Sequence, residues 1–425
     1  MRLIEYKSVG EEVWYEKLYN GLTVLVVPKK NYSRTYAFFA TNYGGCDRRF
    51  KLDGQWHDTP AGVAHFLEHK MFDLPDGSNA LTTLSENGAS PNAFTANGMT
   101  GYLFRCTDKF EENLTVLLNF VMTPYFTEES VAKEQGIIGQ EIKMGEDSPA
   151  RRLRQNLMKA LYANHPVRDS IAGTVESIAE ITPEVLYACH KAFYNPSNMV
   201  LCVSGNADPE RVKQIVLDNV KTMGAEVPER DYGEEESELP AKIRIEDEMA
   251  VAMPLFMFGA KLPFEADGRS FMKQLLTGEL ACEMLMGESS ELYSQMYKEG
   301  LINRSFYCGT ADFPGGAFTA AGGESKDPYA VMERITEAAA KMAESGGEQL
   351  FERLKKAMLG STIRALDSVE NICHNEAEAF FHGYSSFEAK DILLSVNIED
   401  CRAFLRKYFA IEKLAMSVIR PLEEK

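Results

Sequence analysis

Residues 62–73 read GVAHFLEHKMFD, and this segment combines two histidines with one glutamate. His65 and His69 are four positions apart, so on an α-helix their side chains lie on one face, about one turn apart. Two imidazoles placed in this way can bind one metal ion, and zinc is an ion that imidazole binds well. Glu68 lies beside the same face, where its carboxylate can take a proton from a metal-bound water. The alternative is an ordinary helix that carries two histidines.

A catalytic zinc site of this kind needs a third protein ligand from another rigid element. Residues 131–147, VAKEQGIIGQEIKMGED, repeat apolar positions with the 3.6-residue period of a helix, which we expect over 129–146. Glu134 and Glu141 are seven positions apart and lie roughly on one face of that helix. Buried carboxylates are costly unless they are paired or bound to metal, so both are candidate ligands. A surface salt bridge is the alternative for each. The order His-x-x-Glu-His is the inverzincin signature.

Composition excludes several classes of protein. The 425 residues are 45% hydrophobic and 25% charged, which is typical of a globular chain of two to four domains. The net charge of −18 argues against nucleic acid as a partner, because that role needs a basic face. We expect no membrane-spanning segment, since no apolar run reaches about 18 residues. The N-terminus lacks a secretory pattern, and the eight cysteines form no CxxC pair, so we expect reduced core thiols in a cytoplasmic protein.

Apolar patterning predicts the elements that must position this chemistry. The histidine helix is expected between strands on either side of it in the sequence. A hairpin turn at Asn97-Gly98 is expected within residues 91–106. The expected strands are 21–30, 35–43 and 198–205, and the expected helices are 62–72, 110–126, 129–146 and 150–163.

The order of elements starts again after an acidic segment at 224–239, GAEVPERDYGEEESEL. Residues 181–204 align without a gap with 396–419, each as a helix, a short loop and a strand. We therefore expect an α+β protein of two duplicated α/β-sandwich domains, with mostly antiparallel sheets flanked by helices. The second half is expected to form a strand at 249–261, a helix at 271–287, a strand pair at 304–323 and helices at 327–344 and 346–367.

These patterns predict the domain ranges. The N-terminal domain, with the two histidines, is expected at 1–222. A solvated acidic linker is expected at 223–242, and a homologous C-terminal domain without the histidine motif at 243–425.

Four segments, in order, make the chain similar to the pitrilysin/insulinase (M16) zinc peptidases. HFLEH (65–69) matches the family's His-x-x-Glu-His, and EQGIIGQE (134–141) matches its Glu-x6-Glu element. SPNAFT (90–95) matches the Asn-Ala-x-Thr strand, and FYNPSNM (193–199) matches Phe-Tyr-x-Pro-x-Asn-Met. The resemblance is densest over residues 20–210 and weaker in the second half.

The resemblance implies a zinc endopeptidase that hydrolyses peptides or small unfolded polypeptides, with one Zn²⁺ per chain. His65, His69 and Glu141 would bind the ion. Glu68 would be the general base and would later pass the proton to the leaving amine. Glu134 would orient a ligand from outside the coordination sphere.

The resemblance also implies where the peptide binds. Asn92, Ala93 and Phe94 would hold it as an added edge strand of the sheet. Two other functions are alternatives: a catalytically idle structural subunit of the same family, and a peptide-binding module that needs zinc only for stability. The intact histidines and glutamates argue against an idle subunit.

One segment departs from the family pattern. Active members also use an Arg and a Tyr in a segment resembling L-R-x-K-x-x-L-G-Y, which help to bind the substrate carbonyl. Here LYSQMYKEGLINRSF (292–306) has Tyr297 at the expected Arg and Asn303 near the expected Tyr, with Arg304 off register. Chains of this length in the family work as two-chain clamshells. The resemblance therefore implies a homodimer, or a heterodimer with a related zinc-less subunit that supplies the Arg/Tyr pair.

Overall fold

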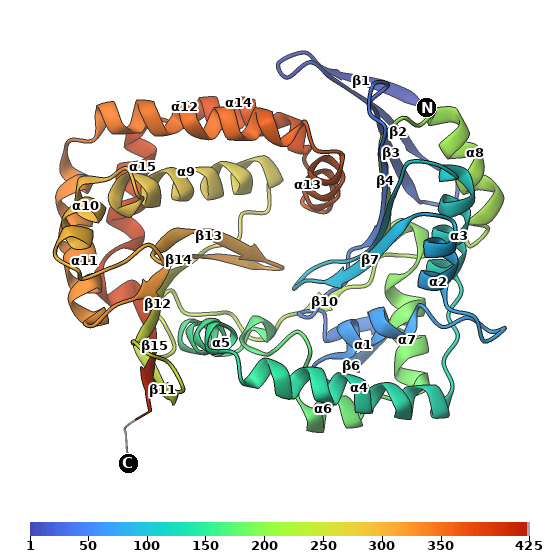
Figure 1. Ribbon diagram of the computed structural model, residues 1–425, viewed down its shortest axis with the longest axis horizontal. Coiled ribbons are helices and arrows are strands. Elements are labelled where there is room, and N and C mark those ends of the chain that lie inside the picture. Colours follow the sequence, from blue (N-terminus) through green and yellow to red (C-terminus); the bar gives the residue numbers. More distant parts are fainter. Residues whose placement is uncertain (423–425) are drawn as a thin grey trace. The chain divides into compact units, whose positions relative to one another are not determined.

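The computed structural model describes residues 1–422, which form two compact units (Figure 1). The first unit contains Met1–Ile142, Ser170–Tyr232 and Ile363–Glu388. The second contains Lys143–Asp169, Gly233–Thr362 and the chain from Ala389 onward. Two segments thus lie outside the unit that their expected range, 1–222 or 243–425, would give them. Lys143–Asp169 belongs to the second unit, and Ile363–Glu388 belongs to the first. The ranges 1–222, 223–242 and 243–425 stay a prediction of the domains.

The sheet of the first unit has seven strands in the order β1-β2-β3-β9-β4-β8-β7. Strand β9 pairs in parallel with β3 and antiparallel with β4, whereas β7 and β8 form an antiparallel hairpin at the sheet edge. The strands are β1 (Arg2–Tyr6), β2 (Glu11–Lys17), β3 (Thr23–Pro28), β4 (Thr35–Thr41), β7 (Ser90–Thr95), β8 (Thr100–Cys106) and β9 (Met199–Gly205).

Both faces of this sheet are covered. Along β3, Val24 and Val26 belong to one hydrophobic cluster, while Leu25 and Val27 belong to another, as alternate side chains of a strand must. The first cluster lies under α1 (Val63–Lys70), α2 (Ala80–Glu86), α3 (Phe110–Met122), α7 (Pro183–Phe193) and α8 (Pro209–Asn219). The second lies under α13 (Val369–Phe381), which packs on β9 and β4 although it comes late in the sequence (Figure 1).

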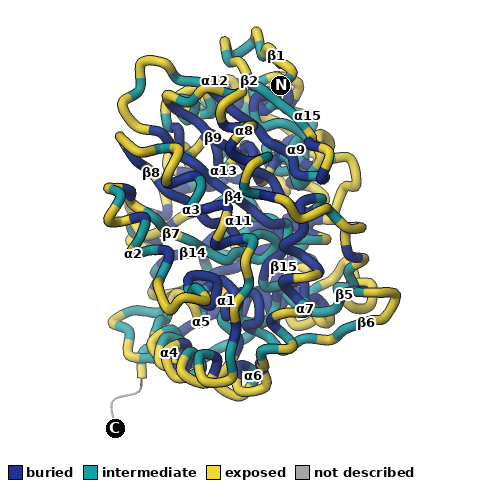
Figure 2. Tube along the Cα trace, turned by 90° about the vertical axis from the view of Figure 1, so that its right-hand side faces the viewer, coloured by how far each residue is buried: buried dark blue, intermediate teal, exposed yellow. Residues whose placement is uncertain are grey.

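Helix α4 (Glu128–Glu146) carries the two candidate glutamates and has few buried residues. Val131, Ile138, Gly139 and Ile142 are its buried positions, and Figure 2 shows the rest mostly as partly or fully exposed. Beside it in the chain are α5 (Pro149–Leu161) and α6 (Val175–Ala179). The amphipathic period thus predicted this helix to within one residue at its start.

A small sheet in the first unit involves the acidic segment. Its order is β10-β5-β6, with β5 at Arg49–Leu52, β6 at Gln55–Asp58 and β10 at Arg230–Asp231. Most residues of the expected linker are exposed, in line with a solvated segment. However, β10 pairs with β5, so part of this segment is fixed to the first unit.

The sheet of the second unit repeats the topology of the first. Its order, β11-β15-β12-β14-β13, corresponds to β3-β9-β4-β8-β7, including the parallel pair at β11 and β15. This confirms the expected duplicated α/β fold. The strands are β11 (Arg244–Met249), β12 (Leu255–Leu262), β13 (Tyr307–Phe313), β14 (Gly316–Glu324) and β15 (Leu414–Pro421), and the helices are α9 (Gly268–Met286), α10 (Glu291–Lys298), α11 (Pro328–Glu344), α12 (Glu348–Ala365), α14 (Ala389–Ser395) and α15 (Ile398–Tyr408).

The bounds of one expected strand are wrong. Residues 249–261 were expected to form a single strand, but β11 ends at Met249 and β12 begins at Leu255. Pro254 lies in the break, and proline cannot donate a ladder hydrogen bond. Within residues 1–422, no helix is both long enough and apolar enough to cross a membrane.

Candidate functional site

Helix α1 presents the two histidines side by side. The helix begins after Gly62, whose φ of 97° is left-handed and whose missing Cβ would lie 2.6 Å from the carbonyl oxygen of Ala172. Phe66 and Leu67 are buried, which fixes the rotation of the helix. As the i, i+4 spacing predicted, the imidazole centroids of His65 and His69 are 4.6 Å apart.

Glu141 of α4 completes a group of three ligand atoms. Its carboxylate oxygens are 3.7 Å from His65 Nε2 and 3.8 Å from His69 Nε2. All three ligand atoms lie within 4.8 Å of one another, and no other such group of three occurs in the described part of the chain. Two atoms that bind one tetrahedral zinc at about 2.1 Å are about 3.4 Å apart. Two imidazoles and one carboxylate at these distances therefore fit a zinc ion after small side-chain movements.

Glu134 has a different position. Its Oε1 lies 3.1 Å from His69 Nδ1, on the far side of the imidazole from Glu141. The hydrogen bond to Glu134 raises the pKa of His69, and burial opposes that rise. A carboxylate that holds the proton on Nδ1 leaves the Nε2 lone pair free for an ion. The geometry therefore favours Glu141, and not Glu134, as the third ligand.

Lys70 is a residue that sequence reasoning missed. It is only 1% exposed, and its Nζ lies 2.5 Å from Asp73 Oδ2 and 3.9 Å from Glu134 Oε2. A buried ammonium needs such partners, and here it offsets part of the negative charge of Glu134. A lysine directly after His69, at a position that packs inward, is the signal that could have revealed it.

Glu68 is held by a threonine of the sheet edge. The carboxylate is 7% exposed, and Thr95 Oγ1 donates a 2.6 Å hydrogen bond to Glu68 Oε2. Burial raises the pKa of Glu68, while the hydrogen bond from Thr95 opposes the rise. Thr95 is the last residue of β7, and its role was not expected, although it belongs to the matched SPNAFT segment. The general-base candidate thus lies on the helix between the two histidines and contacts the edge strand.

Asn92, Ala93 and Phe94 lie in β7, at the edge of the seven-stranded sheet. Among the described residues, β7 pairs with β8 and with no other strand, so its outer edge is open to an added strand. The ring of Phe94 faces the sheet core instead, where it stacks on His374 of α13 with centroids 5.3 Å apart. His374 Nε2 also lies 2.6 Å from the Tyr36 hydroxyl, so α13 braces the strand from within the first unit.

The segment that departs from the family pattern lies in the second unit, where its residues have local partners. Tyr297 is 43% exposed and stacks on Tyr293 with centroids 6.1 Å apart. Asn303 donates to Glu324 Oε2 at 2.7 Å. Tyr297 carries no positive charge and Asn303 carries no phenol, so neither side chain offers the group expected at its position.

Comparisons with known proteins show the family of this chain. The insulinase family (peptidase family M16) matches residues 53–175, and the peptidase M16 inactive domain matches residues 180–358. The chain is 39% identical over 426 residues to an uncharacterized zinc protease, YmfH, of Bacillus subtilis (strain 168), covering 98% of this chain and 99% of the relative. This chain belongs to the peptidase M16 family.

Other proteins are also similar to this chain. An uncharacterized zinc protease of Rickettsia felis is 24% identical, over 93% of this chain and 94% of its own length. A crystal structure described as an M16-like peptidase from Alicyclobacillus acidocaldarius is 34% identical, with a TM-score of 0.92, over 97% of this chain and 99% of that one. A protease from Helicobacter pylori has a TM-score of 0.83 at 17% identity, over 97% of this chain and 100% of that one, and shows the shared fold alone.

Proposed function

We propose that this M16 protein is a zinc-dependent endopeptidase that hydrolyses peptides or small unfolded polypeptides. The observation that carries the proposal is the convergence of His65 Nε2, His69 Nε2 and the Glu141 carboxylate within 4.8 Å, with buried Glu68 on the same helix. Relatives named as zinc proteases support it. A catalytically idle subunit is the alternative, and the complete set of ligands and base argues against it.

We assign the coordination of one Zn²⁺ per chain to His65, His69 and Glu141. A bound zinc would polarise the scissile carbonyl and lower the pKa of a water molecule. Three protein ligands leave a fourth position open for that chemistry. Glu134 keeps the proton on His69 Nδ1, so that the imidazole offers its other nitrogen to the ion.

Glu68 acts as the general base. It takes the proton from the attacking water and then donates it to the amine that leaves when the peptide bond breaks. Its burial makes the carboxylate more basic than an exposed one, which suits the first transfer. Thr95 occupies Oε2, so we assign the proton transfer to Oε1.

The substrate lies along β7. Asn92, Ala93 and Phe94 offer the backbone groups of an open edge strand, so a peptide can add to the sheet in an extended conformation. Because the Phe94 ring is already packed against His374, the contribution of Phe94 is through its backbone. Backbone pairing of this kind accepts many sequences, which suits unfolded polypeptides.

A second chain completes the site in this proposal. Tyr297 and Asn303 stand where active relatives need an Arg and a Tyr, so a partner must supply the pair. The partner that supplies it is a related zinc-less subunit in a two-chain clamshell, because a second copy carries the same Tyr297 and Asn303. A homodimer is the alternative, and its site would lack the pair. We also propose a cytoplasmic location, since none of the eight cysteines is joined in a disulfide and a reducing compartment keeps thiols in that state.

Glu68→Gln tests the proposed function. The variant should keep its zinc, measured by metal analysis, and lose about 10²–10⁴-fold in kcat on an unfolded peptide, because general-base catalysis contributes that much. Glu129→Gln, an exposed change of the same type on α4, is the matched control and should cleave normally. Equal rates for Glu68→Gln and the parent would refute the general-base assignment. A zinc-loaded parent that cleaves no peptide, with or without a related partner, would favour the idle subunit.

A further inference from the structure

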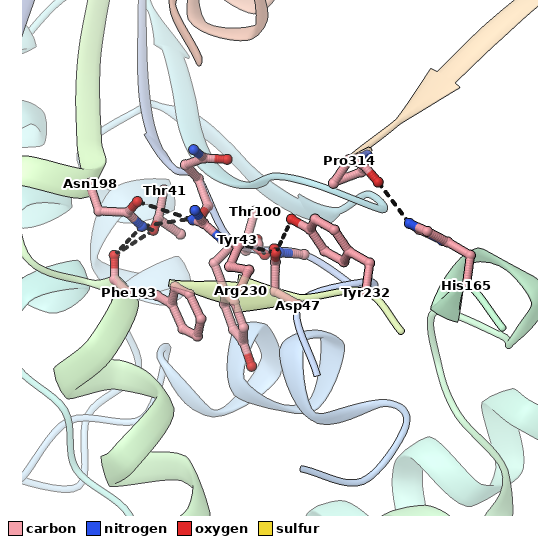
Figure 3. A network of polar contacts seen from close by, with 12 residues as sticks. Thr41, Tyr43, Asp47, Thr100, His165, Phe193, Asn198, Arg230, Tyr232 and Pro314 are labelled. Carbon is pink, nitrogen blue, oxygen red and sulfur yellow. Dashed lines mark hydrogen bonds and ion pairs between the residues drawn. The ribbon is translucent and has the colours of Figure 1, made fainter. Parts of the chain in front are cut away.

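The first unit contains a buried carboxylate that the proposed reaction does not use. Asp47 lies in the turn after β4 and is 1% exposed. Its Oδ2 accepts a hydrogen bond from the Gly44 N–H at 2.8 Å, and its Oδ1 accepts one from the Tyr232 hydroxyl at 2.9 Å. Arg230 Nε lies 3.0 Å from Asp47 Oδ1 (Figure 3). A buried charge of this kind is stable only with a partner, so the position of Asp47 depends on Arg230.

Arg230 in turn ties several segments together. Its Nη2 donates to the carbonyl of Asn42 and to Asn198 Oδ1, which lies 3.2 Å away (Figure 3). The guanidinium also lies over the Phe193 ring, 5.4 Å from the centroid. Since Arg230 belongs to β10, this one side chain fixes the acidic segment to the turns that follow β4 and precede β9.

The turn at residues 44–47 holds the tip of the β7–β8 hairpin. The Gly45 N–H donates to the carbonyl of Ala96, and the Cys46 N–H to that of Asn97, both at 2.9 Å. Gly44 leaves no room between them, because a Cβ there would be 2.5 Å from both carbonyl oxygens. With so little space, a displacement of the turn must displace the hairpin tip.

The hairpin tip leads directly to Glu68. Ala96 follows Thr95, whose hydroxyl donates to Glu68 Oε2 at 2.6 Å. Thr100, on the other side of the tip, donates to the carbonyl of Tyr43 at 2.8 Å, just before the same turn. A continuous series of contacts therefore runs from Arg230 and Asp47, through the turn and the hairpin tip, to the general base.

We propose that Arg230 and Asp47 are positioning residues of the peptidase, which hold Thr95 against Glu68 and keep the edge strand β7 in place for the peptide. This rests on the proposed function, because it concerns the groups that orient Glu68 and the substrate. It also gives the acidic segment a role in catalysis, since a residue of that segment completes the support. The alternative is that the ion pair only stabilises the first unit as a whole.

Hydrogen exchange of Arg230→Gln tests the structural half of the proposal and needs no activity. Amides in peptides covering 44–47 and 92–100 should exchange at least about tenfold faster than in the parent, because local opening becomes easier. Peptides of α4 within residues 128–142, in the same unit, should keep their rates. Arg49→Gln is the matched control: Arg49 pairs with Asp58 and with Asp231 of β10 in exposed ion pairs, so it removes a neighbouring arginine without touching Asp47.

Kinetics test the catalytic half. Arg230→Gln should lower kcat about tenfold and raise KM, since both Thr95 and the edge strand loosen, while its zinc content stays that of the parent. Thr95→Val removes only the hydroxyl, so it should lower kcat about tenfold and leave KM unchanged. Arg49→Gln should match the parent in both constants.

The two experiments distinguish failure of the positioning role from failure of the proposed function. Unchanged exchange at the turn and hairpin overturns the proposal, and so does an equal acceleration across α4, which would mean general destabilisation. If no variant and no parent cleaves peptide, the proposed function fails, while exchange still decides whether Arg230 holds the hairpin. Loosened exchange with parental kcat and KM would overturn the catalytic role. If Arg230→Gln does not fold, Arg230→Lys serves instead, because it keeps a cation for Asp47 and loses the planar contacts to Asn42 and Asn198.

Discussion

His190 should make the first unit sensitive to acid. It lies on α7, is 6% exposed, and its Nε2–H donates to the carbonyl of Val121 at 3.1 Å. Burial lowers the pKa of His190 to about 4 from a usual 6.5. The folded state therefore binds this proton less tightly than the unfolded state. The contribution of neutral His190 to the free energy of unfolding is therefore complete above pH 6.5. It is lost as the pH falls toward 4.

The magnitude follows from the two pKa values. Between pH 7.5 and pH 5 the unfolded state gains the proton and the folded state does not, which costs about 2 kcal/mol of unfolding free energy. The full loss below pH 4 is about 3 kcal/mol. His190→Gln keeps an N–H donor at nearly the same place and removes the titration, so the variant should lose about 2 kcal/mol less than the parent over this range.

Urea unfolding at pH 7.5 and pH 5, followed by tryptophan fluorescence, measures this difference. Both tryptophans of the chain, Trp14 and Trp56, lie in the first unit with His190, so the signal reports that unit. Effects of pH on the metal ligands are common to parent and variant and cancel in the comparison. His57→Gln, which removes a partly exposed histidine of the same unit, is the control. Equal acid sensitivity in His190→Gln and the parent would refute the reasoning.

Three further outcomes are expected. Glu134→Gln should weaken zinc binding about 10–100-fold in a competition titration with a chromogenic chelator, because the His69 Nδ1 proton loses its charged acceptor, and an unchanged affinity would contradict the orienting role. Gly62→Ala should destabilise the first unit by about 1–3 kcal/mol in urea, since a Cβ meets the Ala172 carbonyl and φ is left-handed; Gly54→Ala, also at positive φ but with open space around it, is the control that isolates the clash. Chelator treatment should abolish cleavage, with recovery on adding zinc, while circular dichroism stays unchanged because α1 and α4 are held by buried apolar residues; loss of helix signal would contradict this.

Local periodicity was sufficient to predict the helices and strands that carry the site. The positions of α1, α4 and the β7–β8 hairpin follow from apolar spacing and from a turn at Asn97-Gly98, which are signals within 20 residues of sequence. The alignment of 181–204 with 396–419 also held, since β9 and β15 occupy the same place in their sheets. The duplicated fold could therefore be read from the sequence.

Contacts between distant segments could not be read in this way. Helix α13 covers the first sheet because Val369, Ile372 and Cys373 find apolar partners more than 150 residues earlier, and helical periodicity does not say which sheet a helix covers. Likewise, Arg230 stands in a segment whose composition is that of a solvated linker. Its buried ion pair depends on Asp47, and no pattern in the sequence near either residue predicts the other as its partner.

The choice between Glu134 and Glu141 shows what geometry adds to spacing. Seven residues on a helix are two turns, about 10.5 Å of rise, so both glutamates face the same neighbour but at different heights. His69 lies between them, with Nδ1 3.1 Å from Glu134 and Nε2 3.8 Å from Glu141. Because the two nitrogens of an imidazole point in divergent directions, one histidine can meet both carboxylates, one as a proton acceptor and one as a co-ligand. Ile137, about one turn from each, is exposed and its hydrocarbon side chain has no atom for either role. Spacing alone shows that two carboxylates are available. The resemblance to the M16 peptidases predicted different roles for them, and the orientation of the ring supports that prediction.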